Sequence, residues 1–166
     1  MSQQHISPLE TQLRRLLQDR ILILDGAMGT MIQRYKLTEN DFRGDVFIDH
    51  HKPLRGNNDL LSITRPDIIK EIHAAYFASG ADIVETNTFS GNSIAQDDYE
   101  MAEHVYQINY QSARIAKEVA TEFTTKEPNK PRFVAGSMGP TTKLASMSPD
   151  VNNPGFRAIT FDQLVV

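Results

Sequence analysis

The stretch ILILDGAMGT, residues 21–30, decides the fold that the sequence predicts. Residues 21–24 are four apolar side chains with β-branched residues at alternate positions, a pattern typical of a strand buried on both faces of a parallel sheet. Asp25 then stands at the carboxyl end of the predicted strand, and Gly26 and Gly29 allow a sharp turn after it. Because parallel α/β proteins bind ligands where their strands end, Asp25 is the first candidate for chemistry.

The same residues also have a structural interpretation. Asp-Gly after a strand is a common turn pair, and an aspartate often caps the helix that follows. The spacing of Gly26 and Gly29 fits neither a dinucleotide fingerprint nor a P-loop, and no Gly-Lys-Ser/Thr follows. The stretch therefore leaves a turn and a ligand-binding site both open, and it does not indicate phosphate binding.

Composition limits the classes of partner. The chain has 166 residues, enough for one core of ordinary size, and its 40% hydrophobic and 23% charged residues are typical of a soluble globular protein. The net charge of −4 argues against nucleic acid and against an anionic membrane surface, which both favour basic patches. No apolar run is long enough to span a bilayer. We therefore expect no nucleic acid and no membrane among the partners.

Cysteine is absent from the sequence. The chain therefore forms no disulfide and supplies no thiolate ligand to a metal. Residues 1–5 lack the charged segment and the apolar segment of a signal peptide. Cytoplasm is the compartment that we expect by default.

The residues around the first predicted strand suggest alternating helices and strands. Residues 7–20 predict an amphipathic helix, with Ser7 as cap and Glu10 completing a capping-box spacing. Residues 36–62 show little periodicity and predict a long irregular loop on the active face. The other predicted elements are helices at 30–35, from 64 to a stop at Gly80 and at 99–123, and strands at 81–85 and 133–135.

Because a helix separates each pair of predicted strands, the pattern implies right-handed crossovers and a parallel sheet in an α/β fold. We divide the chain into an N-terminal helix at residues 1–20 and an α/β unit at residues 21–166. A capping-box spacing at residues 160–163 begins a helix at the very end of the sequence. Since an isolated helical turn is unstable, we expect the chain to be a piece of a longer protein.

Polar residues follow all three predicted strands. Asp25 can hold an ammonium group, and the amides from Gly26 onward can receive a carboxylate, which together suit an amino acid. Thr86 and Asn87 follow the second strand, and Ser137 follows the third. Each of these alone is most simply a turn or cap residue. Their repetition at neighbouring strand ends is what predicts a binding site.

Histidines give no clear catalytic or metal site. Adjacent His50 and His51, with Asp49, lack the one-face spacing of metal ligands, and we favour a solvated loop there. His73 and His104 fall in predicted helices, and we expect both at the helix surface. No Ser-His-Asp set or general acid–base pair can be assembled, so we assign no catalytic residue and no metal ligand in this chain.

Several short motifs together carry a resemblance to a known family. The sequence resembles the homocysteine S-methyltransferases, and in particular their cobalamin-dependent branch, from about residue 21 to its end. The matching segments are DGAMGT at 25–30, FRG at 42–44, GNND at 56–59, ETNTF at 85–89, AQ at 95–96 and GSMGPT at 136–141.

The resemblance implies a (β/α)8 TIM barrel, of which this chain would supply about three strand-helix units. It also implies that homocysteine binds at the carboxyl ends of the strands and that a zinc ion held by three cysteines activates its thiol. In the cobalamin-dependent branch the methyl group comes from methylcobalamin, which methyltetrahydrofolate then remethylates. Asp25 and Gly26 match the homocysteine-binding position of the family, and Thr86, Asn87 and Ser137 lie at matching strand ends.

The sequence departs from the family because it contains none of the zinc-ligating cysteines and neither the folate nor the cobalamin module. We therefore expect the chain to be inactive alone, and we expect it to self-associate through its open sheet edges. The alternative is a non-catalytic α/β module that binds an amino acid or a partner protein. Downstream sequence with a cysteine and a later Cys-Cys pair would favour the enzyme, whereas a natural stop codon after Val166 would favour the alternative.

Overall fold

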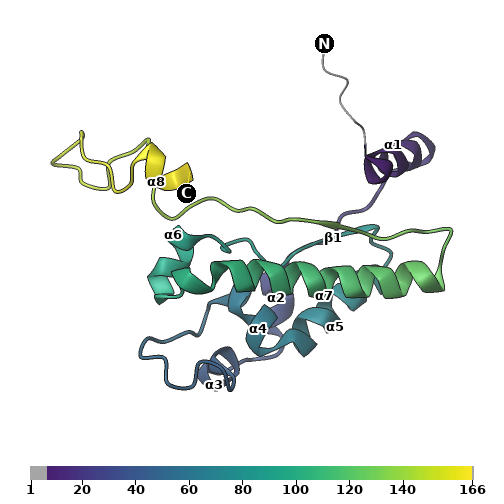
Figure 1. The fold of residues 1–166 in the computed structure, drawn as a ribbon, viewed down its shortest axis with the longest axis horizontal. Helices are drawn as coiled ribbons and strands as arrows, with labels where there is room; N and C mark the ends of the chain where they lie inside the picture. The colour runs from purple at the N-terminus through teal and green to yellow at the C-terminus, as the bar shows by residue number, and fades with distance from the viewer. Residues whose placement is uncertain (1–6, 166) are drawn as a thin grey trace, which may run out of the picture.

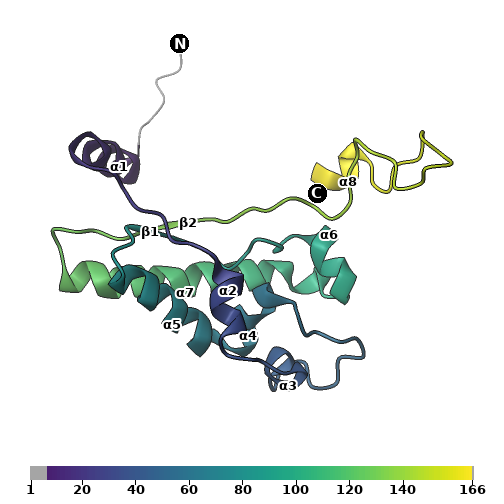
Figure 2. The same ribbon diagram turned by 180° about the vertical axis from the view of Figure 1, so that it is seen from behind.

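The computed structural model describes residues 7–165, so our expectation about a signal peptide in residues 1–5 lies outside it. The longest helix, α7 (Val105–Lys126), packs against α5 (Pro66–Ala78). Two short parallel strands, β1 (Ile83–Glu85) and β2 (Phe133–Ala135), lie over these helices (Figures 1 and 2). None of the described helices has the length and apolar character needed to cross a membrane.

The shorter helices lie before, between and after the elements of this central layer in the chain. α1 has Ser7 as its N-cap, and Pro66 begins α5, as the sequence predicts. The remaining elements are α1 (Pro8–Asp19), α2 (Met28–Gln33), α3 (Glu39–Arg43), η1 (Asn58–Leu60), α4 (Leu61–Thr64), α6 (Ser93–Gln96), η2 (Asp97–Tyr99), η3 (Ala102–His104) and α8 (Phe161–Val165).

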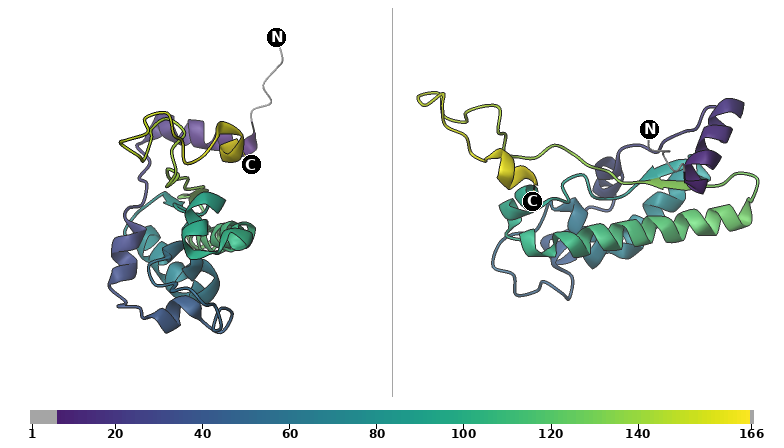
Figure 3. Two further views of the ribbon diagram at one scale, coloured as in Figure 1. Left: turned by 90° about the vertical axis from the view of Figure 1, so that its left-hand side faces the viewer. Right: turned by 45° about the horizontal axis from the view of Figure 1, so that its top comes forward.

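The core lies on the helical side of the strands. The end-on view in Figure 3 places α5 and α7 on one side of the strands and α1 and α8 on the other. Val84 of β1 is completely buried, whereas its neighbour Glu85 is exposed, as expected for alternating faces of a strand. A cluster of buried apolar residues joins α4 to α5 and α7 on the same side of the strands. The fold is therefore α/β with a small two-stranded parallel sheet.

The prediction for residues 21–24 was wrong in part. The segment is extended, but it joins the sheet only through an isolated bridge between Leu24 and Ile83. Ile21, Ile23 and Leu24 have exposed fractions of 82%, 53% and 49%, so the segment is not buried on both faces. The reason is that β1 lies on one side of the segment, and within residues 7–165 no strand pairs with its other side.

Three further expectations need correction. Residues 36–62 are not a simple loop, because they contain α3, η1 and the start of α4. The long helix begins at Val105 rather than Tyr99, since the single turns η2 and η3 precede it. His73 lies inside the core and not on the helix surface: it is fully buried, and burial lowers its pKa to about 4. Three isoleucines of the same helix, at positions 68, 69 and 72, are buried together with His73.

An ion pair fixes the first extended segment against β1. Both guanidinium nitrogens of Arg20 donate to the buried carboxylate of Asp82, at 2.8 and 2.7 Å. The same carboxylate accepts the N–H of Ile23 at 2.8 Å. Arg20 therefore holds the pKa of Asp82 below its usual range. Because the N–H of Asp25 then donates to the carbonyl of Ile83 at 2.9 Å, this arrangement places Asp25 beside the end of β1.

Candidate functional site

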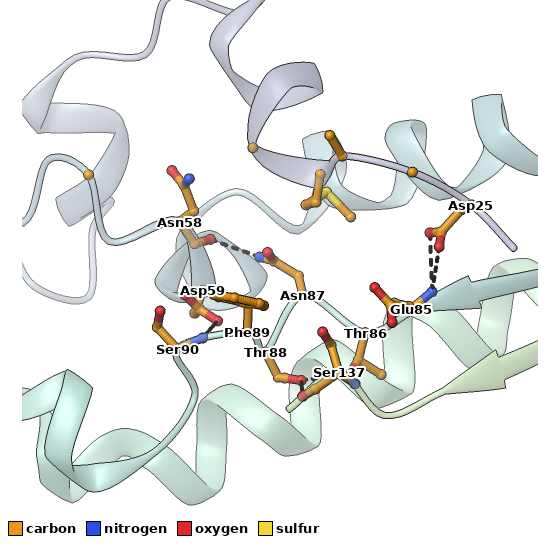
Figure 4. Close-up of a pocket in the computed structure, with 15 residues that line it drawn as sticks. Asp25, Asn58, Asp59, Glu85, Thr86, Asn87, Thr88, Phe89, Ser90 and Ser137 are labelled. Carbon is orange, nitrogen blue, oxygen red and sulfur yellow. Dashed lines mark hydrogen bonds between the residues drawn. The ribbon is translucent and has the colours of Figure 1, made fainter. Parts of the chain in front are cut away.

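A cleft of about 460 Å³ opens at the carboxyl ends of the two strands. Figure 4 shows Asp25 and Glu85 at one end of it and Asn58, Asp59 and Ser90 at the other. All five residues that the sequence predicts for the site line this cleft. The lining consists of Asp25, Gly26, Ala27, Met28, Gly29, Gly56, Asn58, Asp59, Glu85, Thr86, Asn87, Thr88, Phe89, Ser90 and Ser137.

Asp25 is held by the backbone of β1. Both oxygens of its carboxylate accept the N–H of Glu85, at 3.1 Å each. Burial raises the pKa of Asp25 to about 6, and the nearby charge of Glu85 acts in the same direction. The hydrogen bond from the Glu85 N–H opposes this rise. Within the described chain the carboxylate has no cationic partner, so it is available to a positively charged group of a ligand.

The turn after Asp25 brings backbone donors to the cleft. The hydroxyl of Tyr76 on α5 donates to the carbonyl of Ala27 at 3.3 Å. A Cβ on Gly26 would lie 3.4 Å from that hydroxyl, so the turn passes close to the helix. The N–H groups of Gly26 and Ala27 find no acceptor within residues 7–165. Gly26 and Ala27 line the same cleft as the carboxylate of Asp25, and such a set of two backbone donors and one carboxylate suits the carboxylate and ammonium of an amino acid.

The hydroxyls of Thr86 and Thr88 tie the ends of the two strands together. Thr86 donates to Thr88 at 2.7 Å and accepts the N–H of Ser137 at 3.0 Å, while Thr88 donates to the carbonyl of Ser137 at 2.8 Å. The direction of the first bond follows from the other two, because each hydroxyl has a single proton. The side chain of Thr86 is therefore used inside the protein, and it positions Ser137 at the cleft.

The side-chain amide nitrogen of Asn87 holds this residue in place through two hydrogen bonds. This nitrogen donates to the carbonyl of Asn58 at 2.7 Å and to the hydroxyl of Ser62 at 3.2 Å. The carbonyl of Asn87 accepts the hydroxyl of Ser112 on α7 at 3.1 Å. These bonds fix the turn after β1 to α4 and α7, and they orient the Asn87 side chain by its nitrogen alone.

The sequence reasoning missed several residues of the cleft, Asn58, Asp59 and Glu85 among them. Asp59 is buried, and its carboxylate accepts the N–H of Ser90 at 3.0 Å. Buried Asn57 and Gln96 exchange two side-chain hydrogen bonds, at 2.7 and 3.1 Å, and hold the same loop. The signal was present in the sequence, because Asp59 ends the GNND segment that carries part of the family resemblance.

The residues present do not fit the zinc site that the resemblance implies. The sequence has no cysteine. Within the described residues, no group of three His, Asp or Glu side chains could hold a metal ion. Three thiolates are the ligands expected for that zinc, so this chain does not supply them.

Comparison with known proteins identifies the family of the chain and supports its fold. A sequence model of the homocysteine S-methyltransferase family matches residues 22–166. Among solved structures, the metallated form of the homocysteine methyltransferase MmuM from Escherichia coli matches with a TM-score of 0.59 at 22% identity, covering 77% of this chain and 41% of MmuM. Its oxidized form matches with a TM-score of 0.60 at 24% identity, with coverage of 77% and 40%. These two matches support the fold, and the chain spans about two fifths of the neighbours' length. The family match covers most of the sequence, and the chain therefore belongs to the homocysteine S-methyltransferase family.

Proposed function

We propose that this chain is the homocysteine-binding part of a cobalamin-dependent methionine synthase, and that it contributes the first strand-helix units of a (β/α)8 barrel. The observation that carries the proposal is the cleft at the strand ends, where the carboxylate of Asp25 lies next to the free N–H groups of Gly26 and Ala27. The family match supports homocysteine as the substrate. Binding at the carboxyl ends of the strands is also what a barrel of this kind requires.

In this proposal Asp25 accepts hydrogen bonds from the ammonium group of homocysteine, and the amides of Gly26 and Ala27 donate to its carboxylate. Thr86 and Asn87 shape the floor of the cleft through their hydrogen bonds, and Ser137 closes one side. These contacts bind and orient the amino-acid end of the substrate. The thiol end is left for groups outside this chain.

Activation of the thiol is not a task that we assign to this chain, because its residues do not fit a cysteine-bound zinc ion. A free thiol with a pKa of about 8.5 is mostly protonated at neutral pH, so transfer of a methyl group needs activation supplied from elsewhere. We propose that the chain alone is inactive, and that methylcobalamin and methyltetrahydrofolate are partners of the complete protein. We also propose a cytoplasmic enzyme.

Self-association of the isolated chain belongs to the same proposal. Ile21, Ile23 and Leu24 are exposed, and within residues 7–165 no strand pairs with the outer side of β2 or with the outer side of residues 21–24. Exposed apolar strands with unpaired edges favour pairing with another chain.

Homocysteine binding is expected to require the charge of Asp25. Asp25→Asn preserves the size of the side chain but removes the charge-assisted bond, so the affinity should fall by about 1.5–3 kcal/mol. Because burial raises the pKa of Asp25 to about 6, the wild-type affinity should also fall at lower pH. Below that pKa the loss should approach about tenfold per pH unit, since protonation removes the binding form. Calorimetric titration with homocysteine from pH 5 to pH 8 measures both effects.

The Asn variant is its own control for the pH effect, because its affinity should be low and should not change across this range. Glu103→Gln, an exposed change outside the cleft, should behave as the wild type. If the wild type and Asp25→Asn bound homocysteine with equal affinity at pH 7.5, Asp25 would not contact the substrate.

A further inference from the structure

A second buried carboxylate lies at the far end of the cleft from Asp25. Asp59 is only 6% exposed, yet it lines the cleft (Figure 4). One of its oxygens, Oδ1, accepts the N–H of Ser90 at 3.0 Å. Besides the residue's own N–H, no other donor in residues 7–165 reaches this carboxylate. Burial raises the pKa of Asp59, and the backbone hydrogen bonds to its carboxylate oppose this rise.

Asn87 supplies a second acceptor in the lining of the same cleft. Asn87 is 5% exposed and donates both of its hydrogen bonds through its amide nitrogen. Its oxygen, Oδ1, accepts no hydrogen bond from the described residues. Among the described residues, the fully enclosed side-chain atoms without a partner are on Thr64, His73 and Arg132, and neither Oδ2 of Asp59 nor Oδ1 of Asn87 is one of them.

The bond to Ser90 does not explain why residue 59 is an acid. An asparagine would accept the same N–H with its oxygen, at a much smaller desolvation cost than a buried carboxylate. Among residues 7–165, no Lys, Arg or His lines the cleft, so none of the described cations compensates the charge of Asp59 there. A buried acid without a protein cation is a candidate for a functional role.

We propose that Asp59 and Asn87 form a second binding site in the cleft, which takes a primary ammonium group. Two oxygen acceptors match the several N–H donors and the positive charge of such a group. A metal ion fits less well, because it needs more ligands and the described residues provide no cluster of three His, Asp or Glu side chains.

The ammonium has two possible sources. One is the amino group of homocysteine itself. This version rests on homocysteine as the substrate, and it would place the single ammonium of the substrate at Asp59 in place of Asp25, because the two carboxylates lie at opposite ends of the cleft (Figure 4). The other is a separate amine that binds together with the substrate. Methylammonium probes the site without assuming either source.

The test is a titration of the 15N-labelled 166-residue chain with methylammonium chloride, followed through the amide signals of Ser90 and the Asn87 side chain. The wild type should show saturable shifts at both. Asp59→Asn retains the acceptor for Ser90 and should weaken methylammonium binding by about tenfold or more, as expected for loss of a charge-assisted bond. Glu103→Gln, an exposed change outside the cleft, should leave this affinity within about twofold.

Three results would overturn the site: equal methylammonium affinity of Asp59→Asn and the wild type, saturation by tetramethylammonium with the same affinity, or loss of binding in Asp25→Asn alone. Competition then identifies the source. Displacement of methylammonium by homocysteine, but not by 4-mercaptobutyrate, supports the site and assigns it to the substrate amine. Binding of homocysteine without displacement supports a separate amine. Failure of the proposed function has a different signature, because homocysteine would then bind with equal affinity to the wild type and Asp25→Asn.

Discussion

Replacing Phe77 with alanine is expected to lower the free energy of unfolding by about 3–5 kcal/mol, the usual cost of truncating a buried aromatic residue. Phe77 is 1% exposed and lies in the cluster that joins α5 and α7 to β1. Its ring centroid is 5.5 Å from that of Phe123, and the guanidinium of Arg132 lies 5.9 Å from the ring. The substitution would therefore open a cavity directly beneath the strands. Urea denaturation followed by circular dichroism measures the loss.

Tyr106→Ala is the matched control, since this aromatic residue on α7 is 81% exposed. It should change the stability by no more than about 0.5 kcal/mol. If both variants lost the same free energy, the described packing of α5, α7 and β1 would be wrong.

Asp82→Asn is expected to lower the stability by about 2–3 kcal/mol, because it removes the charge from a buried acceptor of several hydrogen bonds. We place the loss below that of a fully buried ion pair, since the side chain of Arg20 is 37% exposed and water can solvate it. The variant should also loosen the segment that carries Asp25. Thermal and urea unfolding measure the first effect, and amide hydrogen exchange at residues 21–25 measures the second.

The pH dependence of this ion pair has a definite sign. Arg20 lowers the pKa of Asp82 in the folded state, so the unfolded chain binds a proton more readily. The stabilisation is therefore complete above the unfolded pKa of about 3.9, and it is lost as the pH falls through the folded pKa. The Asp82→Asn variant should not show this loss of stability at low pH, whereas the exposed change Asp98→Asn should still show it. Identical acid unfolding curves for Asp82→Asn and the wild type would contradict this role.

The position of the candidate cleft was the most predictable part of the molecule. Asp25, Gly26, Thr86, Asn87 and Ser137 all follow predicted strands, and the parallel arrangement brings strand ends to one edge. The sequence could not show how each side chain is used. The hydroxyl of Thr86, for example, is consumed by Thr88 and Ser137 through bonds that depend on the packing of the two strand ends.

Burial was harder to predict than secondary structure. The alternation in residues 21–24 correctly indicates an extended backbone, but whether such a segment is covered depends on its neighbours in space. The error at His73 has the opposite sign. A polar residue in a helix is expected at the surface, but His73 is buried in the core together with the isoleucines of the same helix. Both errors concern tertiary packing, which local periodicity does not encode.

Helices in residues 36–62 were missed for a different reason. α3 and α4 are only five and four residues long, too short to show a periodic apolar face. The capping box of Thr38 and Asp41 was the available signal for α3. Asp59 follows in η1, so missing this region also meant missing one of the two carboxylates that are most buried in the cleft.

Homocysteine binding in the cleft at the strand ends can be followed residue by residue, by amide-resolved NMR of the labelled chain during a homocysteine titration. Saturable shifts are expected at Gly26, Ala27, Glu85 and Ser137, and none of comparable size on the exposed face of α7 at Tyr106 and Tyr110. 4-Mercaptobutyrate, which lacks the ammonium group, is expected to bind at least about tenfold more weakly. Saturable shifts confined to residues outside the cleft, or no shifts at all, would show that homocysteine does not bind there.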